Sequence, residues 1–515
     1  MVDAVRLRRH ERPPGLHPLR SPSPKIRDAS AVILVRHGER PGREVFWVRR
    51  GERVGFGGGY YAFPGGKVDA ADASTPILAC PQGEEGFQVA AIRETFEEAG
   101  VLLARGTSRL TPERLHALRL ELLGGASFAA LLEREGLVLD ARALIPAGRW
   151  MTPDIAPVRF DTRFYLAYLP EGQEAVVIPG ELSDGGWIRP AEALARWEAG
   201  TALLHPPNHH AHATLAGFGP ESAIPRLRNP PYVCESHVVN RIEFQRGILY
   251  YPLLTPTLPP ARHTNCYVVG TGELAVIDPG TPYPDEQAWF LERLRELQGE
   301  GRTVKCILLT HYHADHTGFA QALSRELDVP VWASPATAER VPGAEGRLAD
   351  GQVISLGGPM PMRLRCVLTE GHARGHLCFL DEGSGAVIAG DMVAQGSSIV
   401  LDPPEGELGT YLESLRRLLR LPAKVLYPAH GFPIPDGASL LESYLSHRED
   451  RLAAIRGALR AAEGPVALAA IVERVYSDTP SFLHPVAERS ALASLLELER
   501  LGDARQDADG WAATR

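Results

Sequence analysis

Three histidines and an aspartate, His311, His313, Asp315 and His316, lie within six residues of one another. The residues before them, 303–310, are mostly β-prone and favour a buried strand. Imidazole nitrogens and carboxylate oxygens are ligands that suit zinc, and a catalytic zinc site keeps one position open for water. The H-x-H-x-D-H spacing at a strand end therefore predicts a zinc site, and the number of side chains favours two ions.

Three further candidate ligands, His372, Asp391 and His430, each follow a predicted strand. Because loops at strand ends converge at one rim of a sandwich, we expect these side chains to meet the first cluster. Two zinc ions about 3.5–4 Å apart can share a water and lower its pKa to roughly 7. The metal-bound hydroxide then attacks a carbonyl or phosphorus centre. If only one ion binds, Asp315 can instead accept a proton.

A second candidate site consists of Glu94, Glu97 and Glu98, which share one face of a helix expected over residues 86–99. Carboxylates on one helix face repel each other, and Mg²⁺ or Mn²⁺, which prefer oxygen ligands, would remove that repulsion. Taken alone, the same pattern also fits a solvated acidic face. The helix therefore suggests a site for a harder metal without requiring one.

The composition is that of a globular protein with more than one domain, since 515 residues with 44% hydrophobic content exceed one ordinary core. A net charge of −9 gives no overall attraction to nucleic acid or to an anionic membrane. The six cysteines form no CxxC pair, and no apolar signal region follows the N-terminus. We therefore expect a cytoplasmic protein with reduced thiols, no membrane partner and a phosphorylated substrate bound locally.

Changes of pattern along the chain predict a mixed α/β and α+β protein in five segments. They are a flexible lead-in at 1–28, a segment of strands and helices at 29–205, a Pro- and His-rich linker at 206–237, an αββα sandwich at 238–437 and a helical tail at 438–515. Three expected helices and a small hairpin give the tail the outline of a winged helix. Because it has no basic stripe, we expect it to complete the active-site wall or form a homodimer interface, with nucleic acid less favoured.

The motif around the glutamates resembles the Nudix box: Phe63-Pro64-Gly65-Gly66 lies upstream, and Arg93-Glu94-x-x-Glu97-Glu98-x-Gly100 follows. The resemblance implies an α/β/α sandwich over residues 29–205, and it implies that the three glutamates hold Mg²⁺ or Mn²⁺ and act in hydrolysis of a nucleoside-diphosphate-linked compound. It also implies that Arg93 braces them.

Two departures from that family pattern bear on the substrate. Asp72 stands where the family has a glutamate, and residues 73–86 look inserted. The insertion, together with the runs 148–153 and 159–164, resembles the Nudix branch that contains peroxisomal CoA diphosphatases. A CoA-type substrate follows from this resemblance, with Arg50 as a candidate substrate-binding residue.

Residues 240–435 resemble the metallo-β-lactamase fold. The resemblance implies one zinc on His311, His313 and His372, a second on Asp315, His316 and His430, and Asp391 bridging them. Asp278 matches the buried structural aspartate of that family. His376 is either a substrate-facing donor or a structural histidine.

The tail, beginning at Tyr444-Leu445-Ser446-His447-Arg448, resembles that of the β-lactamase-like endoribonuclease family found in mitochondria, which has thioesterase relatives. The sequence thus predicts a bifunctional hydrolase: Nudix-type diphosphate cleavage, and dinuclear-zinc hydrolysis of an ester, thioester or phosphodiester. The alternative is a zinc hydrolase regulated by a catalytically weak Nudix module that senses nucleotide.

Overall fold

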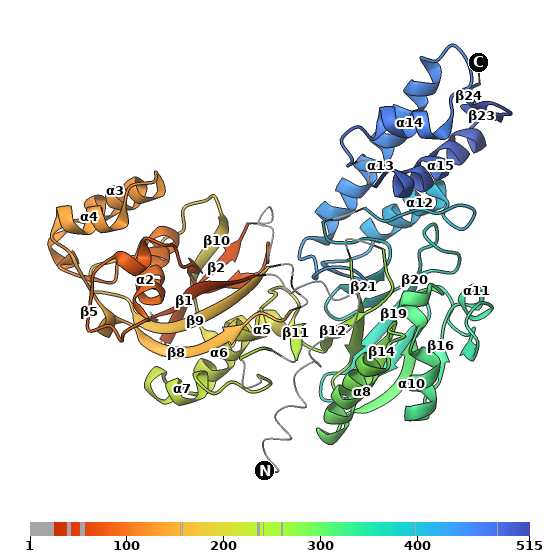
Figure 1. Ribbon diagram of the computed structural model, residues 1–515. Helices are drawn as coiled ribbons and strands as arrows, with labels where there is room; N and C mark the ends of the chain where they lie inside the picture. The colour runs from red at the N-terminus through yellow and green to blue at the C-terminus, as the bar shows by residue number, and fades with distance from the viewer. Residues whose placement is uncertain are drawn as a thin grey trace. The chain divides into compact units, whose positions relative to one another are not determined.

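The computed structural model describes most of the chain, and its contacts divide that chain into two compact units, Met1–Arg246 and Gly247–Arg515 (Figure 1). The described residues are 25–38, 43–51, 57–154, 156, 158–233, 237–239, 241–258, 261–396, 398–480 and 483–514. Most of the predicted lead-in, residues 1–24, therefore lies outside them. Among the described residues, no helix is both long and apolar enough to cross a membrane.

A mixed sheet forms the centre of the first unit, in the order β10-β2-β1-β9-β8. Its strands are β1 (Ile26–His37), β2 (Arg43–Arg50), β8 (Ile145–Met151), β9 (Arg159–Tyr168) and β10 (Leu182–Ile188). Strand β1 pairs in parallel with β9 and antiparallel with β2. Residues 29–35 of β1 are all buried, as expected for a central strand covered on both faces.

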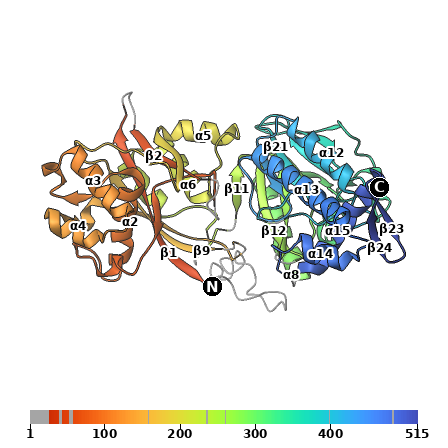
Figure 2. The same cartoon turned by 90° about the horizontal axis from the view of Figure 1, so that it is seen from above.

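Helices cover both faces of this sheet, which confirms the predicted α/β/α sandwich (Figure 2). Helix α2 (Glu85–Ala99) buries Val89, Ile92 and Phe96 in one core with Val32 and Leu34 of β1. On the opposite face, helix α6 (Pro206–Gly217) brings a buried His212 ring to 5.9 Å from that of Trp47.

The first unit also has a second, small sheet, in the order β5-β7-β6. Its elements are β5 (Ile77–Leu78), β6 (Ala104–Arg105), β7 (Val138–Asp140), α3 (Pro112–Leu123) and α4 (Phe128–Glu135). Both helices begin with a hydroxyl cap, because Thr111 accepts from the Arg114 amide and Ser127 from the Ala130 amide.

Where the sequence predicted a linker, at 206–237, the structure has two helices, α6 and α7 (Pro220–Leu227). Proline is the reason for the linker prediction, but Pro206 and Pro220 lie at the first turns of the two helices, where proline costs no hydrogen bond, and Pro225 lies inside α7. Histidines in and next to α6 pack on aromatic rings: His209 on Trp197 of α5 (Pro190–Glu198), and His205, which precedes the helix, on Tyr60.

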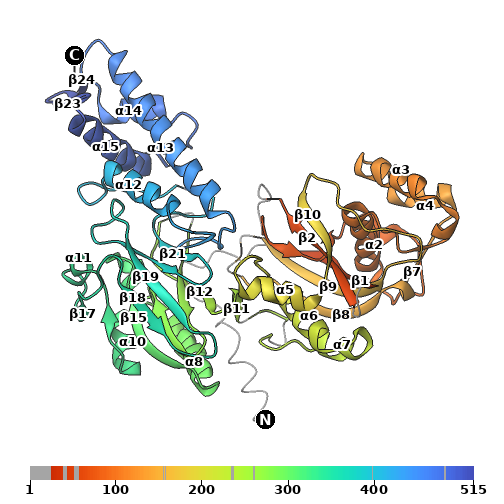
Figure 3. The ribbon, with the colours of Figure 1, turned by 180° about the vertical axis from the view of Figure 1, so that it is seen from behind.

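Two facing sheets with outer helices build the second unit and confirm the predicted αββα sandwich (Figure 3). The first contains β12 (Ile248–Leu254), β13 (His263–Val269), β14 (Glu273–Ile277), β15 (Thr303–Leu308), β16 (Val331–Trp332) and β17 (Ala344–Glu345). The second contains β18 (Val353–Leu356), β19 (Met362–Leu368), β20 (Leu377–Asp381), β21 (Ala386–Gly390) and β22 (Val425–Pro428). Helices α8 (Pro284–Gly299) and α10 (Ala320–Leu327) share a core with the first sheet, and α12 (Leu408–Leu419) shares one with the second.

The tail has the three helices and the hairpin expected of a winged helix. They are α13 (Gly437–Arg460), α14 (Leu468–Val475), α15 (His484–Arg500), β23 (Ala504–Asp507) and β24 (Gly510–Ala513). Trp511 of the hairpin packs with Ile471 and Leu495 in a core separate from that of the sandwich. The first half of α13 differs, because Leu441 and Tyr444 are buried in the core of the second sheet.

Gly280, after β14, provides a test of how tightly the second unit packs its ligand-bearing loop. A Cβ at this position would lie 1.7 Å from the Asp315 carbonyl oxygen, whereas one at Gly299 would meet nothing within 4 Å. We expect Gly280→Ala to destabilise the protein by about 1–3 kcal/mol or more, and Gly299→Ala to be neutral or stabilising by up to about 1 kcal/mol. Thermal unfolding measures both, and equal midpoints for the two variants would contradict the close approach.

Candidate metal centres

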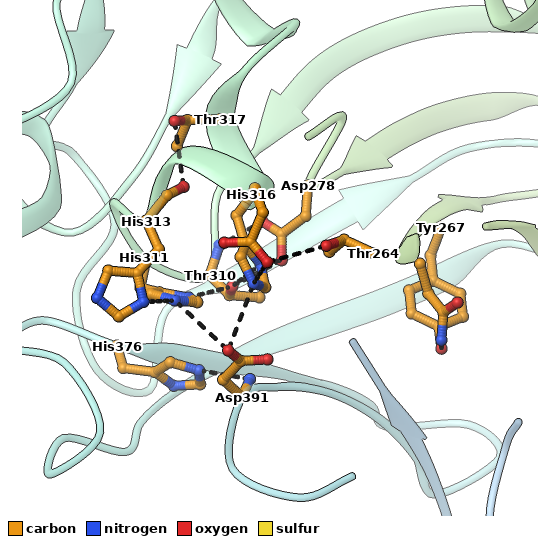
Figure 4. A network of polar contacts seen from close by, with 12 residues as sticks. Thr264, Tyr267, Asp278, Thr310, His311, His313, His316, Thr317, His376 and Asp391 are labelled. Carbon is orange, nitrogen blue, oxygen red and sulfur yellow. Dashed lines mark hydrogen bonds and ion pairs between the residues drawn. The ribbon is translucent and has the colours of Figure 1, made fainter. Parts of the chain in front are cut away.

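The segment after β15 carries four polar side chains at one rim of the second unit. Residues 309–313 link the end of β15 to α9, whose single turn is Ala314–Thr317. This short link and turn place His311 and His313 in one ligand group and Asp315 and His316 in another, and Figure 4 shows the three histidines close together. His372 comes from the loop after β19, Asp391 from the end of β21 and His430 from the end of β22.

These seven side chains form two groups. Within each group, the ligand atoms all lie within 4.8 Å of one another. One group contains His311, His313, His372 and Asp391, and the other contains Asp315, His316 and His430. The two groups approach each other at Asp391, whose Oδ1 lies 3.4 Å from His430 Nε2 and whose Oδ2 lies 3.4 Å from His372 Nε2. The structure thus brings together every residue for which the sequence predicted zinc binding in this unit.

Four of the five imidazoles are oriented by a hydrogen bond on the far side of the ring. The pairs are His311 Nδ1 with Thr310 Oγ1 (3.0 Å), His316 Nδ1 with Asp278 Oδ2 (2.9 Å), His372 Nδ1 with the Val400 carbonyl (3.0 Å) and His430 Nδ1 with the His263 carbonyl (2.9 Å). In each ring, Nε2 is left facing the centre. His313 presents Nδ1 instead, 2.8 Å from His311 Nε2. Such outer contacts fix ring direction and tautomer in metal sites.

Burial makes the centre electrostatically incomplete without a cation. His316 Nε2 and Asp391 Oδ1 are buried atoms with no hydrogen-bond partner among the described residues. Burial also lowers the pKa of His311 far below its usual range and that of His313 to about 4, so both rings are neutral, as metal ligands must be. For His316, burial lowers the pKa, but Asp315, Asp391 and Asp278 outweigh it and raise the pKa. Nitrogen and carboxylate donors of this kind fit a zinc-like divalent ion.

Asp278 holds the base of the cluster in a strained backbone conformation. Its φ is +53°, which is uncommon for a residue other than glycine. One carboxylate oxygen accepts the Thr310 amide at 2.8 Å, and the other accepts the Thr310 hydroxyl at 2.6 Å and contacts His316. The side chain is buried, in accord with the structural role that the resemblance implied. It therefore fixes the direction of His311 and His316 together.

Of the two alternatives for His376, a substrate-facing donor or a structural histidine, the contacts of its ring favour the second. Its ring is fully buried, Nδ1 lies 2.9 Å from Thr369 Oγ1, and Nε2 accepts the Asp391 amide at 3.2 Å. A Cβ on Gly390 would lie 2.6 Å from that Nε2, so the two segments meet closely. His376 thus holds the backbone of Asp391, which is the structural alternative.

Sequence reasoning missed the outer partners of the ligands. The Val400 and His263 carbonyls belong to the backbone and carry no residue-type signal, and Thr264, which donates to Asp315 Oδ2 at 3.0 Å, is an ordinary strand residue. A polar rim beside the cluster was also missed: Glu405 accepts from Tyr312 at 3.0 Å and pairs with Arg340 at 2.9 Å. Only Asp278 could be found, from its Ile-Asp-Pro-Gly context.

Removing one ligand of the first group tests the two-group arrangement. Because His316, Asp315 and His430 form a separate group, we expect His372→Ala to lose one of two bound divalent ions and retain the other. The exposed His447 provides a control on α13, and His447→Ala should keep both. Metal analysis after dialysis measures the difference. Unchanged metal content in His372→Ala would contradict the assignment.

The acidic site of the first unit is organised by Arg93, which is buried. Its guanidinium bonds both oxygens of Asp72 at 2.9 Å, Glu94 at 2.9 Å and Glu97 at 3.0 Å. Asp72, at the position of the family's glutamate, therefore takes part in bracing the arginine. Glu98 accepts the Gly65 amide at 2.8 Å. Arg93 thus orients two of the three glutamates, as the sequence resemblance implied.

Close packing and burial leave these glutamates short of positive charge. A Cβ on Gly66 would lie 2.4 Å from Glu94 Oε1, so only glycine fits beside the helix. Burial raises the pKa of Glu94 to about 7, and burial together with Glu94 raises the pKa of Glu98 to about 8. Among the described residues, the ligand oxygens of these three carboxylates do not form one group with all atoms within 4.8 Å of one another. Their chemistry nevertheless fits Mg²⁺ or Mn²⁺, which would supply the missing charge.

Arg50, the predicted substrate-binding residue, lies at the edge of this site. It forms an ion pair of 3.5 Å with Glu181, and its charge lowers the pKa of Glu98 against the effect of burial. Glu181 acts in the opposite direction on both Glu94 and Glu98. The sequence carried no signal for Glu181, which lies 83 residues beyond Glu98 and reaches the site through the pairing of β10 with β2.

The raised pKa values predict how Mg²⁺ binding to the first unit depends on pH. Since bound protons compete with the ion, we expect apparent Mg²⁺ affinity to rise about tenfold or more per pH unit below 7 and to level off above 8. The stability of the metal-free protein changes with pH in the opposite direction. Its folded state retains protons above the usual glutamate pKa of 4.5, so its stability falls as the pH rises from about 4.5 to 8. Calorimetric titration measures the affinity, and Glu94→Gln should reduce its slope with pH. An affinity independent of pH would contradict these protonation states.

Comparison with known families assigns both parts of the chain. The family described as "Metallo-beta-lactamase superfamily" matches residues 259–430, and the "NUDT19 Nudix domain" matches residues 79–214. The "Beta-lactamase associated winged helix domain" matches residues 468–511. The three matches fall on the second unit, the first unit and the tail.

Curated relatives match part of this chain. Lactamase-like protein nscB of Arthroderma gypseum is 31% identical over 249 residues, which are 46% of this chain and 74% of the relative. Lactamase-like protein adaB of Aspergillus niger is 35% identical over 201 residues, 38% of this chain. The chain spans 58% of the length of that second relative.

Solved structures resemble each half separately. A metallo-beta-lactamase family protein from Thermus thermophilus has 25% identity and a TM-score of 0.44, covering 53% of this chain and 100% of its own. A Nudix hydrolase from Alicyclobacillus acidocaldarius has 30% identity and a TM-score of 0.36, covering 41% of this chain and 100% of its own.

Proposed function

Because the chain belongs to the metallo-β-lactamase superfamily and also carries a Nudix domain, we propose that it is a bifunctional, metal-dependent hydrolase. The first unit cleaves a nucleoside-diphosphate-linked substrate of the CoA type. The second hydrolyses an ester or thioester with two zinc ions. The observation that carries the proposal is the pair of ligand groups, each within 4.8 Å, at one rim of the second unit.

The residues of the second unit have distinct tasks in this reaction. His311, His313 and His372 would hold one ion, and His316 and His430 would hold the other with Asp315. Asp391 lies within 3.4 Å of a ligand nitrogen from each group, which suits a shared carboxylate. When bound, the ions supply a water of lowered pKa and a Lewis acid for the reacting carbonyl. If only one ion binds, Asp315 is left free to accept a proton.

The charge pattern of the tail favours the ester or thioester over a nucleic acid substrate. Its arginines are largely paired with carboxylates, for example Arg451 with Asp478 at 2.6 Å and Arg456 with Asp503 at 2.9 Å. Binding to long nucleic acid depends on cations available for phosphates, and the chain's net charge of −9 opposes it. A phosphodiester therefore ranks second as the substrate of this site.

In the first unit, the arrangement of the glutamates favours catalysis over nucleotide sensing alone. Arg93 holds Glu94 and Glu97, and Gly65 holds Glu98, so all three carboxylates have defined positions. Arg50 and its partner Glu181 lie beside them, and the guanidinium can bind a diphosphate or a phosphate of CoA. Glu97 and its neighbours would hold Mg²⁺ or Mn²⁺, which neutralises a diphosphate during cleavage.

Two variants of the same chain, each the control for the other, test the proposal. We expect His313→Ala to abolish hydrolysis of acyl-CoA and aryl ester substrates while CoA diphosphate cleavage persists. Glu97→Gln should reduce diphosphate cleavage about 100-fold and leave ester hydrolysis unchanged, because the two sites have separate ligands.

The assay panel contains CoA, acyl-CoA, nucleotide sugars, bis(p-nitrophenyl) phosphate and single-stranded RNA, each with and without Zn²⁺ and Mg²⁺. Cleavage of RNA with no ester hydrolysis would replace the thioesterase proposal by a nuclease. Ester hydrolysis that responds to CoA, with no diphosphate cleavage by any form, would make the first unit a sensor. Unchanged ester hydrolysis in His313→Ala together with unchanged diphosphate cleavage in Glu97→Gln would overturn the assignment of both sites.

A further inference from the structure

One loop connects the metal centre to the helical tail. Its described residues, 392–396 and 398–400, start directly after Asp391 and end at Val400, whose carbonyl accepts from His372 Nδ1 at 3.0 Å. The two ends of the loop therefore determine the position of two members of the same ligand group. Any displacement of its backbone moves Asp391, rotates the His372 ring, or does both.

Side chains outside the sandwich sheets hold this loop at three points along its backbone. Tyr444 Oη accepts the Ala394 amide at 3.1 Å and donates to the Ala394 carbonyl at 3.0 Å. Arg448 donates to the Ile399 carbonyl, one residue before Val400. Tyr411 of α12 donates to the Met392 carbonyl at 2.7 Å. Two of these three side chains belong to α13, the first helix of the tail, which packs on α12 (Figure 3).

The burial of Arg448 has no explanation in stability alone. The residue is only 6% exposed, forms no ion pair with a carboxylate of the described residues, and has a buried Nε without a hydrogen-bond partner there. A buried cation without a counter-ion is costly, and a methionine of similar length would fill the space at lower cost. Its guanidinium carbon lies 5.5 Å from the Tyr411 ring centre, which joins the loop contacts into one network. This cost indicates that the contact with Ile399 has a function.

We propose that Arg448 and Tyr444 are positioning residues of the metal centre, through which the tail sets the geometry of the His311, His313, His372 and Asp391 group. The inference rests on the proposed metal-dependent function of the second unit. Neither residue touches substrate or metal: both act through the loop backbone, at Ala394 and Ile399. The tail thereby contributes to the geometry of the metal centre as well as packing on the sandwich.

Arg451 provides a matched control on the same helix. It lies three residues beyond Arg448, and its guanidinium contacts Val475 and Asp478, both within the tail. Replacing either arginine by methionine removes a charge and a carbonyl contact from α13, but only Arg448→Met frees the metal-centre loop. The full-length chain is used for all variants, with unfolding midpoints recorded to monitor the fold.

The primary measurement is metal affinity, determined by competition between the metal-free protein and a chromogenic chelator for Zn²⁺. We expect Arg448→Met to weaken one of two Zn²⁺ equivalents about tenfold, the lower end of the effect of outer contacts on metal sites. Arg451→Met should keep both affinities. The visible spectrum of the Co²⁺-loaded protein should change for Arg448→Met alone, because ligand geometry changes. Tyr444→Phe, which removes a single hydroxyl, should shift the same Zn²⁺ equivalent if Arg448→Met does not fold.

Native Zn²⁺ affinities and an unchanged Co²⁺ spectrum in Arg448→Met and Tyr444→Phe would overturn the inference. Equal losses in Arg448→Met and Arg451→Met would also overturn it, because they would reflect a general loss of stability. Failure of the proposed function is distinguishable, since the unmodified protein would then bind no Zn²⁺ at all.

Discussion

The second unit depends on how five imidazoles and two aspartates are accommodated in a buried rim. His311 and His316 are fully buried, and Asp391 is nearly so. Desolvation makes free charge costly there, and neutral imidazoles packed beside carboxylates leave lone pairs without donors. The outer hydrogen bonds to Thr310, Asp278, Val400 and His263 hold four of the five rings in place even so. A site that is costly without a cation and rigid before the cation arrives is organised for metal.

The first unit also has partly buried ligands that lack a cation, but its ligands are carboxylates. Its glutamates gather on one face of α2, and a single buried arginine neutralises part of their charge. Oxygen ligands of this kind suit hard ions, whereas the imidazoles of the second unit suit zinc. Two chemistries can therefore operate in one chain without competing for the same ion. A shared substrate class, carrying both a diphosphate and an acyl group, would give a reason for their fusion.

Sequence patterns predicted the elements whose signal is local. The spacing of His311, His313, Asp315 and His316 located one metal group, and strand ends supplied His372, Asp391 and His430. Helix α2 agreed with the expected bounds to within one residue, and the three expected tail helices are present, because apolar periodicity and a capping glycine after α2 are local signals. These are the features that a chain carries in residue type and spacing.

The remaining features arise from contacts between distant segments and carry no residue-type signal. Backbone carbonyls at Val400 and His263 orient two ligands, and a helix begins at Pro206 where composition suggested a linker. His376 was ambiguous until its burial and its bond to the Asp391 amide were known. The role of Arg448 likewise depends on a loop 49 residues earlier in the chain.

The proposed function of the second unit requires two metal ions, held at the groups that meet at Asp391. Anomalous X-ray diffraction at the zinc absorption edge, from crystals of the Zn²⁺-loaded protein, tests it most directly. Two anomalous peaks are predicted, one among His311, His313 and His372 and one among Asp315, His316 and His430, with Asp391 contacting both. A single peak, or peaks only at surface residues away from these groups, would contradict it.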